Sequence, residues 1–337
     1  MDHPILAHVA LGYSPIIDRD RAVTAVRLQV FPRQAGQPLD AGQLLAAVAE
    51  VWPAGGAPVA LSVRSESLLA DLLRAKPAAN VMVEVPHFMA GDPAHADALV
   101  SLHSRGVRLL LSGRPNAPLP GALLPCFSHA IIDLADDRRL DEAPDAPRPP
   151  RSIGFWQDGV RTVADMEGSF RRGAQAVLGW PIDEVTASGP QQKAGRPDLQ
   201  VIVELIQRVD KEEPIDRLEA TLRRDPTLAY KLMRYINSAA FGLTVEITSF
   251  GHAIMMLGYQ RLKRWLALLL ATASKDANLR PVMYAAVRRG LILERLVGPD
   301  ADSDLRSEIF ICGVFSLLDR MFQQPFGELL KSIPVSQ

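Results

Sequence analysis

The sequence has little cysteine and no excess of either charge, and both shortages exclude classes of protein. Two cysteines occur in 337 residues, Cys126 and Cys312. They form no CxxC or Cys/His spacing, so neither a disulfide framework nor a zinc module is encoded, and a reducing cytoplasm is the expected location. Lys and Arg total 37 against 38 Asp and Glu. This balance disfavours nucleic acid as a partner, because that affinity depends on clustered basic side chains.

Long hydrophobic runs and nucleotide-binding motifs are lacking as well. The longest apolar run spans Trp265 to Ala273, well short of the roughly 20 residues that a membrane helix needs. The N-terminal MDHPILAHVALG has no basic region and no small-residue cleavage site, so it does not resemble a secretion signal. No GxGxxG or GxxxxGK[ST] follows any predicted strand, which gives a Rossmann or P-loop domain no support. We therefore expect no membrane span.

Two segments rich in Pro, Gly or small polar residues interrupt the apolar periodicity, at Asp141 to Arg151 and at Thr186 to Pro197. Closely spaced prolines cannot continue a helix, since each removes a donor and clashes with the preceding turn. The character of the sequence changes at the second segment. We therefore predict two domains, residues 1–190 and 191–337, a number that suits a chain of this length.

Short apolar runs alternate with helix-period segments in the first domain. The predicted strands are Ile5 to Val9, Val23 to Phe31, Val59 to Val63, Val81 to Val85, Arg108 to Leu111, Ala130 to Leu134 and Ser152 to Trp156. Ala41 to Val51, Ser65 to Ala75 and Pro93 to Ser104 are predicted helices. Nearly continuous apolar strands are typical of a parallel sheet covered on both faces. The pattern predicts an α/β domain, either a barrel or a doubly wound sheet.

The second domain shows no convincing strand and is predicted to be all-α. The expected helices are Leu199 to Val209, Ile215 to Arg224, Thr227 to Ser238, Thr248 to Leu257, Gln260 to Ser274, Pro281 to Val297 and Leu305 to Phe322. Asp225-Pro226, Gly242 and Gly258 separate several of them with residues that commonly end helices. The apolar helix around Trp265 is interpreted as the centre of a bundle.

Two stretches of the second domain resemble the HDOD domain, a helical signalling module of bacteria related to the HD hydrolases. They are RRDPTLAYKLMRYINSAAFG, from Arg223 to Gly242, and ITSFGHAIMMLGYQRLKRWLA, from Ile247 to Ala267. The motif residues, expected to be structural or to bind partners, are Asp225, Pro226, Asn237, Ser238, Phe241, Gly242, Ser249 and Gly258. We expect Asn237 and Phe241 to be buried. Ser316 and Leu317 stand where HD enzymes have their metal-binding His-Asp pair, so no metal is expected here.

The first domain resembles, more weakly, an EAL domain, a TIM-type barrel that hydrolyses cyclic di-GMP when active. The opening hairpin, Tyr13 to Phe31, contributes to this resemblance. The whole chain thus resembles the EAL and HDOD domain-containing signalling proteins, which implies a degenerate TIM-type (EAL-like) barrel followed by a helical HDOD bundle. The proline-rich segment from Asp141 stands where the family has a helix, which raises the alternative of an open or distorted barrel.

Most metal-binding positions of the active EAL family carry other residues in this chain. Arg27, Ser62, Ser112 and Gly113 stand where that family has its metal-binding Glu, Asn and paired Asp residues, and Ile131 replaces its general-base Lys. Only Glu84 and Asp133 are retained, with Arg27 the third residual position. Two carboxylates cannot hold two hard cations, which prefer about six oxygen ligands each. The resemblance therefore implies no catalytic residue, no metal and no cofactor.

Three functional hypotheses remain open. The first is a non-enzymatic cytoplasmic signalling protein whose barrel senses or docks and whose HDOD domain contacts signalling partners. The second is an effector that binds cyclic di-GMP without hydrolysing it. The third, least favoured, is a DNA-binding regulator that uses the basic residues Arg223, Arg224, Lys231 and Arg234, although Leu222, Leu228, Leu232 and Ile236 are expected to turn that unit inward. His87, His95, His103 and His129 are interpreted as ordinary histidines, because they share no ligand spacing.

Overall fold

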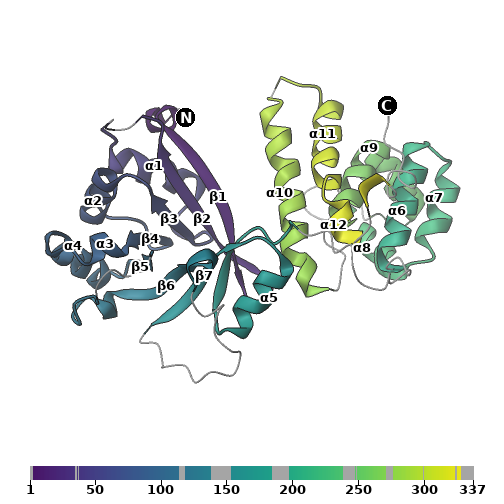
Figure 1. Ribbon diagram of the computed structural model, residues 1–337. Coiled ribbons are helices and arrows are strands. Elements are labelled where there is room, and N and C mark those ends of the chain that lie inside the picture. Colours follow the sequence, from purple (N-terminus) through teal and green to yellow (C-terminus); the bar gives the residue numbers. More distant parts are fainter. Residues whose placement is uncertain are drawn as a thin grey trace. The chain divides into compact units, whose positions relative to one another are not determined.

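A computed structural model gives the fold as two units (Figure 1). The units are Met1–Asp183 and Glu184–Gln337, and each is described by itself. The structure describes residues 3–34, 36, 38–113, 118–137, 153–183, 197–237, 247, 249–270, 276–298, 300–322 and 325–327. The predicted boundary between residues 190 and 191 lies outside these ranges.

The first unit is a closed eight-stranded barrel in which neighbouring strands follow the order of the sequence. Its strands are β1 (Val9–Asp18), β2 (Val23–Pro32), β3 (Val59–Val63), β4 (Val81–Pro86), β5 (Arg108–Ser112), β6 (Phe127–Asp133), β7 (Gly154–Val160) and β8 (Ala176–Gly179). Strand β1 runs antiparallel to β2 and to β8, whereas the pairs from β2 to β8 are parallel. The carboxyl ends of seven parallel strands therefore meet at one end of the barrel.

Helices cover the outside of the barrel. They are α1 (Ala41–Val51), α2 (Glu66–Arg74), α3 (His87–Ala90), α4 (Pro93–Ser104) and α5 (Val163–Arg171). Asp40, Ser65, Asp92 and Thr162 cap four of them by accepting hydrogen bonds from backbone N–H groups. Strands β3, β4 and β5 are buried at nearly every position, because one set of side chains packs against the helices and the other fills the interior. The interior layer comprises Ile16, Ala25, Ala60, Met82, Leu110, Ile131, Trp156, Ala176 and Leu178.

The α/β prediction is confirmed, although several strand bounds differ from those predicted: β6 begins at Phe127 rather than at Ala130, and β8 was not among the predicted strands. Residues Pro4–Ala7 form a 3₁₀ helix rather than the predicted strand from Ile5, because Pro4 suits the first position of a helical turn. Strand β7 begins two residues later than predicted and extends to Val160. The barrel is closed, so the alternative of an open barrel is wrong.

The second unit contains only helices within the ranges described. They are α6 (Pro197–Asp210), α7 (Ile215–Leu222), α8 (Pro226–Ile236), α9 (Phe250–Leu270), α10 (Arg280–Leu296), α11 (Ser303–Phe315) and α12 (Leu318–Phe322), together with a 3₁₀ turn, Ala277–Leu279. Helix α9 is central, as predicted, because it packs against α6, α7, α8 and α11. The all-α prediction is confirmed.

Glycines shape this unit at two places. Gly258 has φ +70° inside α9 and interrupts the helix where the sequence predicts a break. Helices α10 and α11 approach closely at Gly290 and Gly313, since a Cβ on Gly313 would lie 2.5 Å from the Gly290 Cα. The predicted helix from Leu305 to Phe322 is wrong in one respect, because it breaks after Phe315.

Candidate functional site

Polar side chains from four strands lie buried toward the carboxyl end of the barrel. Arg27 is on β2, Ser62 on β3, Glu84 on β4 and Ser112 on β5. Ser62 lies opposite Glu84 in the parallel register. All four are among the buried polar residues of the chain, and each is at most 8% exposed. In parallel α/β barrels this end carries the functional residues, so these side chains define the candidate site.

Arg27 binds two carboxylates at this site. Its Nε donates to Glu84 Oε2 at 2.8 Å and its Nη2 donates to Glu84 Oε1 at 2.7 Å, which is the two-bond geometry preferred between guanidinium and carboxylate. Its Nη1 donates to Asp158 Oδ2 at 2.5 Å. The side chains of Arg27 and Glu84 are 4% and 3% exposed, and that of Asp158 is 21% exposed. We call Arg27, Glu84 and Asp158 the barrel ion cluster.

The charges of this cluster depend on one another. Burial acts to lower the pKa of Arg27, but the charge and hydrogen bonds of Glu84, and then those of Asp158, outweigh burial and hold that pKa above its ordinary value. The guanidinium is therefore ionised at any physiological pH. Two carboxylates therefore share this one guanidinium.

The structure brings together two of the three residual positions. Arg27 and Glu84 are in contact, whereas Asp133 is exposed and its Oδ1 accepts a hydrogen bond from the Ala135 N–H, which caps a short 3₁₀ turn, Leu134–Asp136. Asp158 was missed by the sequence interpretation. In the sequence, Asp158 stands out only by preceding Gly159. The structure places both residues late in β7, where Gly159 has φ +77°.

A cavity of about 250 Å³ opens beside Glu84. It lies at the carboxyl ends of β3, β4 and β5. Polar and apolar residues both line it: Ser62, Val63, Arg64, Ser65, Glu66, Leu69, Glu84, Pro86, Phe88, Met89 and Ser112. The side chain of Phe88 is 60% exposed. The cavity thus offers hydroxyls, one exposed guanidinium and an aromatic edge to a small molecule.

The described HDOD motif residues act as helix caps and supports. Asp225 Oδ1 accepts from the Leu228 N–H and caps α8. Ser249 Oγ accepts from the His252 N–H at the start of α9. Pro226 occupies the first turn of α8, where its missing N–H costs nothing. These positions are structural in the geometry observed.

Asn237 joins the end of α8 to the backbone of Ile247. Its Nδ2 donates to the Ile247 carbonyl and its Oδ1 accepts from the Ile247 N–H, both at 2.8 Å. The residue itself is exposed, so the prediction of a buried Asn237 is wrong, because the amide satisfies a buried neighbour from the surface. Ser238, Phe241 and Gly242 lie outside the described residues.

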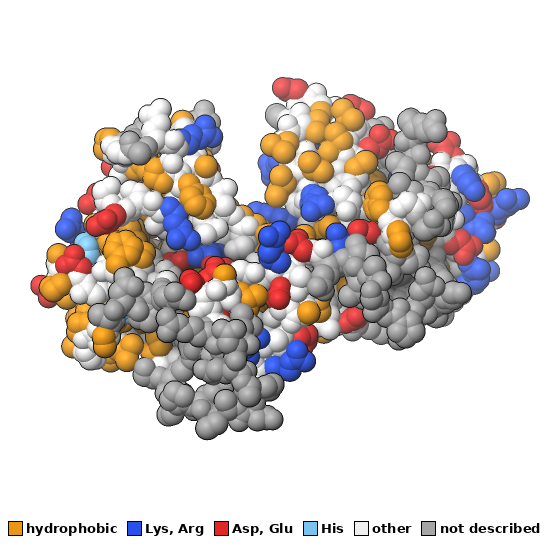
Figure 2. Space-filling model, viewed as in Figure 1, with side chains coloured by type: hydrophobic (Ala, Val, Ile, Leu, Met, Phe, Trp, Pro, Cys, Tyr) orange, Lys and Arg blue, Asp and Glu red, His pale blue; other side chains and the backbone are white. Residues whose placement is uncertain are grey.

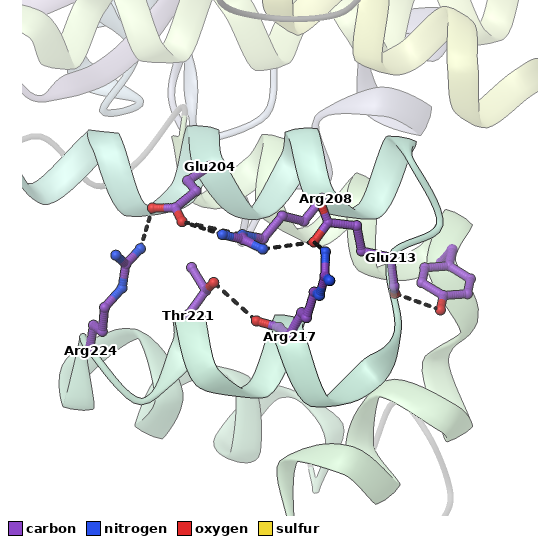
Figure 3. Close-up of polar contacts among 7 residues, drawn as sticks. Glu204, Arg208, Glu213, Arg217, Thr221 and Arg224 are labelled. Atoms are coloured by element: carbon purple, nitrogen blue, oxygen red, sulfur yellow. Dashed lines mark hydrogen bonds and ion pairs between the residues drawn. The ribbon is translucent and has the colours of Figure 1, made fainter.

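An ion-pair network joins α6 to α7 in the second unit (Figure 3). Arg208 bonds Glu204 at 3.0 Å and Glu213 at 2.7 Å, and Arg224 pairs with Glu204. Burial tends to raise the pKa of Glu204, but the hydrogen bonds and charges of Arg208 and Arg224 hold that pKa below its usual range. The network therefore neutralises much of the basic charge on this surface.

Two of the four basic residues in the unit considered for DNA binding form ion pairs as well. Arg223 pairs with Glu219, and Arg224 pairs with Glu204. The predicted inward residues Leu222, Leu228, Leu232 and Ile236 are all buried, as expected. Helix α8 therefore turns its apolar face to the bundle rather than outward.

No group of three His, Cys, Asp or Glu side chains in the described ranges could hold a metal ion. None of the helices that the structure describes is both long and apolar enough to cross a bilayer.

Comparisons with known proteins place a family on the second unit. The model of the HDOD domain matches residues 197–319, so the helical unit contains an HDOD domain. Across both units, the cyclic di-GMP phosphodiesterase CdgJ of Vibrio cholerae is 22% identical over 80% of this chain and 63% of its own length. The uncharacterized protein YuxH of Bacillus subtilis is 27% identical across 55% of this chain and 46% of its own. The chain thus spans about half to two thirds of these relatives.

Solved structures similar to this chain include EAL proteins. The phosphodiesterase PaMucR, in complex with c-di-GMP, is 17% identical with a TM-score of 0.37 and covers 53% of this chain and 92% of its own. The EAL domain of Mycobacterium smegmatis DcpA is 18% identical with a TM-score of 0.35 and covers 52% of this chain and 92% of its own.

Proposed function

We propose that this protein is a non-enzymatic signalling protein in which the barrel serves as a sensor or docking module and the HDOD domain contacts a protein partner. The observation that carries the proposal is the barrel ion cluster. A buried guanidinium satisfies both oxygens of Glu84 and one oxygen of Asp158. An active EAL barrel would instead direct such carboxylates at the metal ions beside its substrate.

The residues present do not fit two divalent cations. Hard cations need about six oxygen ligands each and are repelled by a fixed positive charge. Here Arg27 already neutralises Glu84, and the neighbouring positions supply the hydroxyls of Ser62 and Ser112 rather than carboxylates. Among the barrel residues that the structure describes, we therefore infer no ligand set for hydrolysis by two metal ions.

The same cluster disfavours a cyclic dinucleotide inside the barrel. The Nε, Nη1 and Nη2 donors of Arg27 are directed at Glu84 and Asp158 rather than at a phosphodiester. The cavity beside it, about 250 Å³, is below the roughly 300–1,000 Å³ typical of pockets for small organic ligands. These points support a sensor or docking module over an effector that binds cyclic di-GMP.

Two relatives make cyclic di-GMP the compound to test. CdgJ carries the name of a cyclic di-GMP phosphodiesterase, and PaMucR was solved with c-di-GMP. The test is calorimetric titration of the full chain with cyclic di-GMP, with and without Mg²⁺. We expect no heat of binding under either condition. Binding with a micromolar Kd would favour the cyclic di-GMP effector instead.

A cyclic di-GMP effector is the second candidate, favoured by the hydroxyls and the Arg64 guanidinium around the cavity. In that case the titration would show binding without turnover, and Arg64→Ala would weaken it. Arg74→Ala is the matched control, because Arg74 is an exposed arginine at the other end of α2 whose partner is Asp71.

A further inference from the structure

Two buried serine hydroxyls line the cavity at the carboxyl ends of β3, β4 and β5. Ser62 on β3 is 2% exposed, and Ser112 on β5 is 8% exposed. Within the described ranges, neither hydroxyl has a hydrogen-bond partner. A buried polar group without a partner costs free energy. Two such groups in the lining of one cavity therefore mark a place where a bound molecule can supply the missing hydrogen bonds.

Glu84 adds hydrogen-bond acceptors to the same lining. It lies on β4, the strand between the two that carry the serines, and it stands opposite Ser62 in the parallel register. Its two oxygens each accept one bond from Arg27, at 2.7 and 2.8 Å. An ionised carboxylate can accept about four hydrogen bonds. About half of the acceptor capacity of Glu84 therefore stays available to a donor in the cavity.

The charges around the cavity disfavour a charged ligand of either sign. An anion near Ser62 would lie beside the Glu84 carboxylate, and a cation near Glu84 would lie beside the Arg27 guanidinium. Elsewhere in the lining, Arg64 is balanced by Glu66. Figure 2 shows acidic and basic side chains interspersed on the barrel, at the left of the view, so no field of one sign is concentrated on that face. These groups suit an uncharged molecule.

The size of the cavity and its apolar side chains narrow the class of ligand further. The volume of about 250 Å³ is the share of about eight water molecules in the liquid, which suits a molecule of monosaccharide size and not a cyclic dinucleotide. Leu69 and Met89, each 1% exposed, line the cavity together with the exposed Phe88. Apolar side chains combined with a few polar groups are typical of ligand pockets. Here the apolar side chains can pack against C–H groups while the polar groups bond hydroxyls.

We infer that this cavity binds a small uncharged molecule rich in hydroxyl groups, of the size of a monosaccharide. Hydroxyls of the ligand donate to Glu84 and exchange hydrogen bonds with Ser62 and Ser112, since a hydroxyl both donates and accepts. The C–H face of the ligand packs against Phe88. The inference rests on the proposed function, because it names the class of compound that a sensing barrel recognises.

Saturation-transfer NMR of the full chain with D-glucose, D-ribose and myo-inositol tests the inference. We expect saturable binding of at least one of them, with a Kd at or below about 10 mM. Ser62→Ala and Ser112→Ala should each weaken that binding about fivefold, because each variant loses one hydrogen bond to the ligand. Ser101→Ala is the matched control, since Ser101 is an exposed serine on α4, and it should bind as wild type does.

Melting curves without ligand separate binding from a structural role. Ser62→Ala and Ser112→Ala should melt no lower than wild type, because each removes a hydroxyl that has no partner. A lower melting temperature in both variants would assign the serines to the stability of the barrel and overturn the inference.

Competition with cyclic di-GMP separates this inference from the proposed function. We expect cyclic di-GMP to leave the bound compound in place. Failure of all three compounds to bind, or binding that both serine variants retain in full, would overturn the inference alone and leave the docking role of the barrel standing. Displacement of the bound compound by cyclic di-GMP would overturn the proposed function as well.

Discussion

Removal of the Arg27 guanidinium should destabilise the barrel strongly. In Arg27→Ala, Glu84 loses both of its bonds to the guanidinium and Asp158 loses one, while Glu84 remains buried among the strands. Breaking a buried ion pair by removing one partner costs about 3–5 kcal/mol, because an uncompensated charge is left behind. We expect a loss of this size in the free energy of unfolding of the barrel.

Arg161→Ala is the control for this substitution. Arg161 also bonds a carboxylate, Asp183 at 2.5 Å, but its side chain is 76% exposed. Exposed pairs contribute about 0–1 kcal/mol, so this variant should unfold close to wild type. The two arginines therefore differ in burial and share their chemistry.

Urea unfolding followed by tryptophan fluorescence supplies the assay, since Trp52, Trp156 and Trp180 report on the barrel unit. Hydrogen exchange of peptides from β2, β4 and β7 then places the loss within the barrel. A double-mutant cycle with Glu84→Ala should give a coupling energy of about 1–3 kcal/mol. If Arg27→Ala and Arg161→Ala unfold at the same urea concentration, or if the coupling energy is zero, the barrel ion cluster does not stabilise the barrel.

Three further predictions follow from other contacts. Without metal, Arg27→Glu should be less stable than Arg27→Ala, because a third carboxylate joins Glu84 and Asp158. Millimolar Mg²⁺ should raise the melting temperature of Arg27→Glu but not that of wild type. An equal shift in both proteins would contradict this prediction. Asn237→Ala should lower the melting temperature of the helical unit by removing about 1–3 kcal/mol, because the backbone groups of buried Ile247 lose both partners, whereas exposed Lys231→Ala should not. Burial, opposed by the Gln175 hydrogen bond and reinforced by the Arg108 charge, holds the pKa of His129 below its ordinary 6.5. The folded barrel thus binds fewer protons there than the unfolded chain, so its stability should fall as pH drops below about 6.5, and His129→Gln should flatten that slope in urea titrations from pH 7.5 to 5; an equal slope in the variant would refute it.

The strands that the sequence predicts well are those buried on both faces. Val59–Val63 is apolar except at Ser62, and its observed bounds match the prediction. The list of predicted strands missed β1 because Gly12 and Pro15 interrupt its apolar pattern, although the resemblance placed a hairpin at Tyr13 to Phe31, which the pairing of β1 with β2 confirms. Both residues are tolerated because β8 pairs only with Ile16, Ile17 and Asp18, so the other edge of β1 has no described strand partner at Gly12 and Pro15. Local pattern cannot reveal such tertiary compensation.

The site was only half predictable for a related reason. Arg27 and Glu84 were identified by comparison with a family pattern, which says what residue stands at a position but not what it contacts. Asp158 lies 131 positions from Arg27 in the sequence, and closure of the barrel brings the two together. The family pattern predicts that Arg27 replaces a metal ligand, but not that Arg27 binds two carboxylates. Asn237 shows the same limit, since the motif identifies the residue but the structure shows it exposed rather than buried.

The central claim is that the barrel does not hydrolyse cyclic di-GMP, and product formation tests it most directly. The full chain is incubated with cyclic di-GMP and Mg²⁺ or Mn²⁺, and the nucleotides are separated by chromatography over several hours. We predict no linear dinucleotide above a protein-free blank with either metal. Turnover in the wild-type chain that Glu84→Ala abolishes would contradict the account.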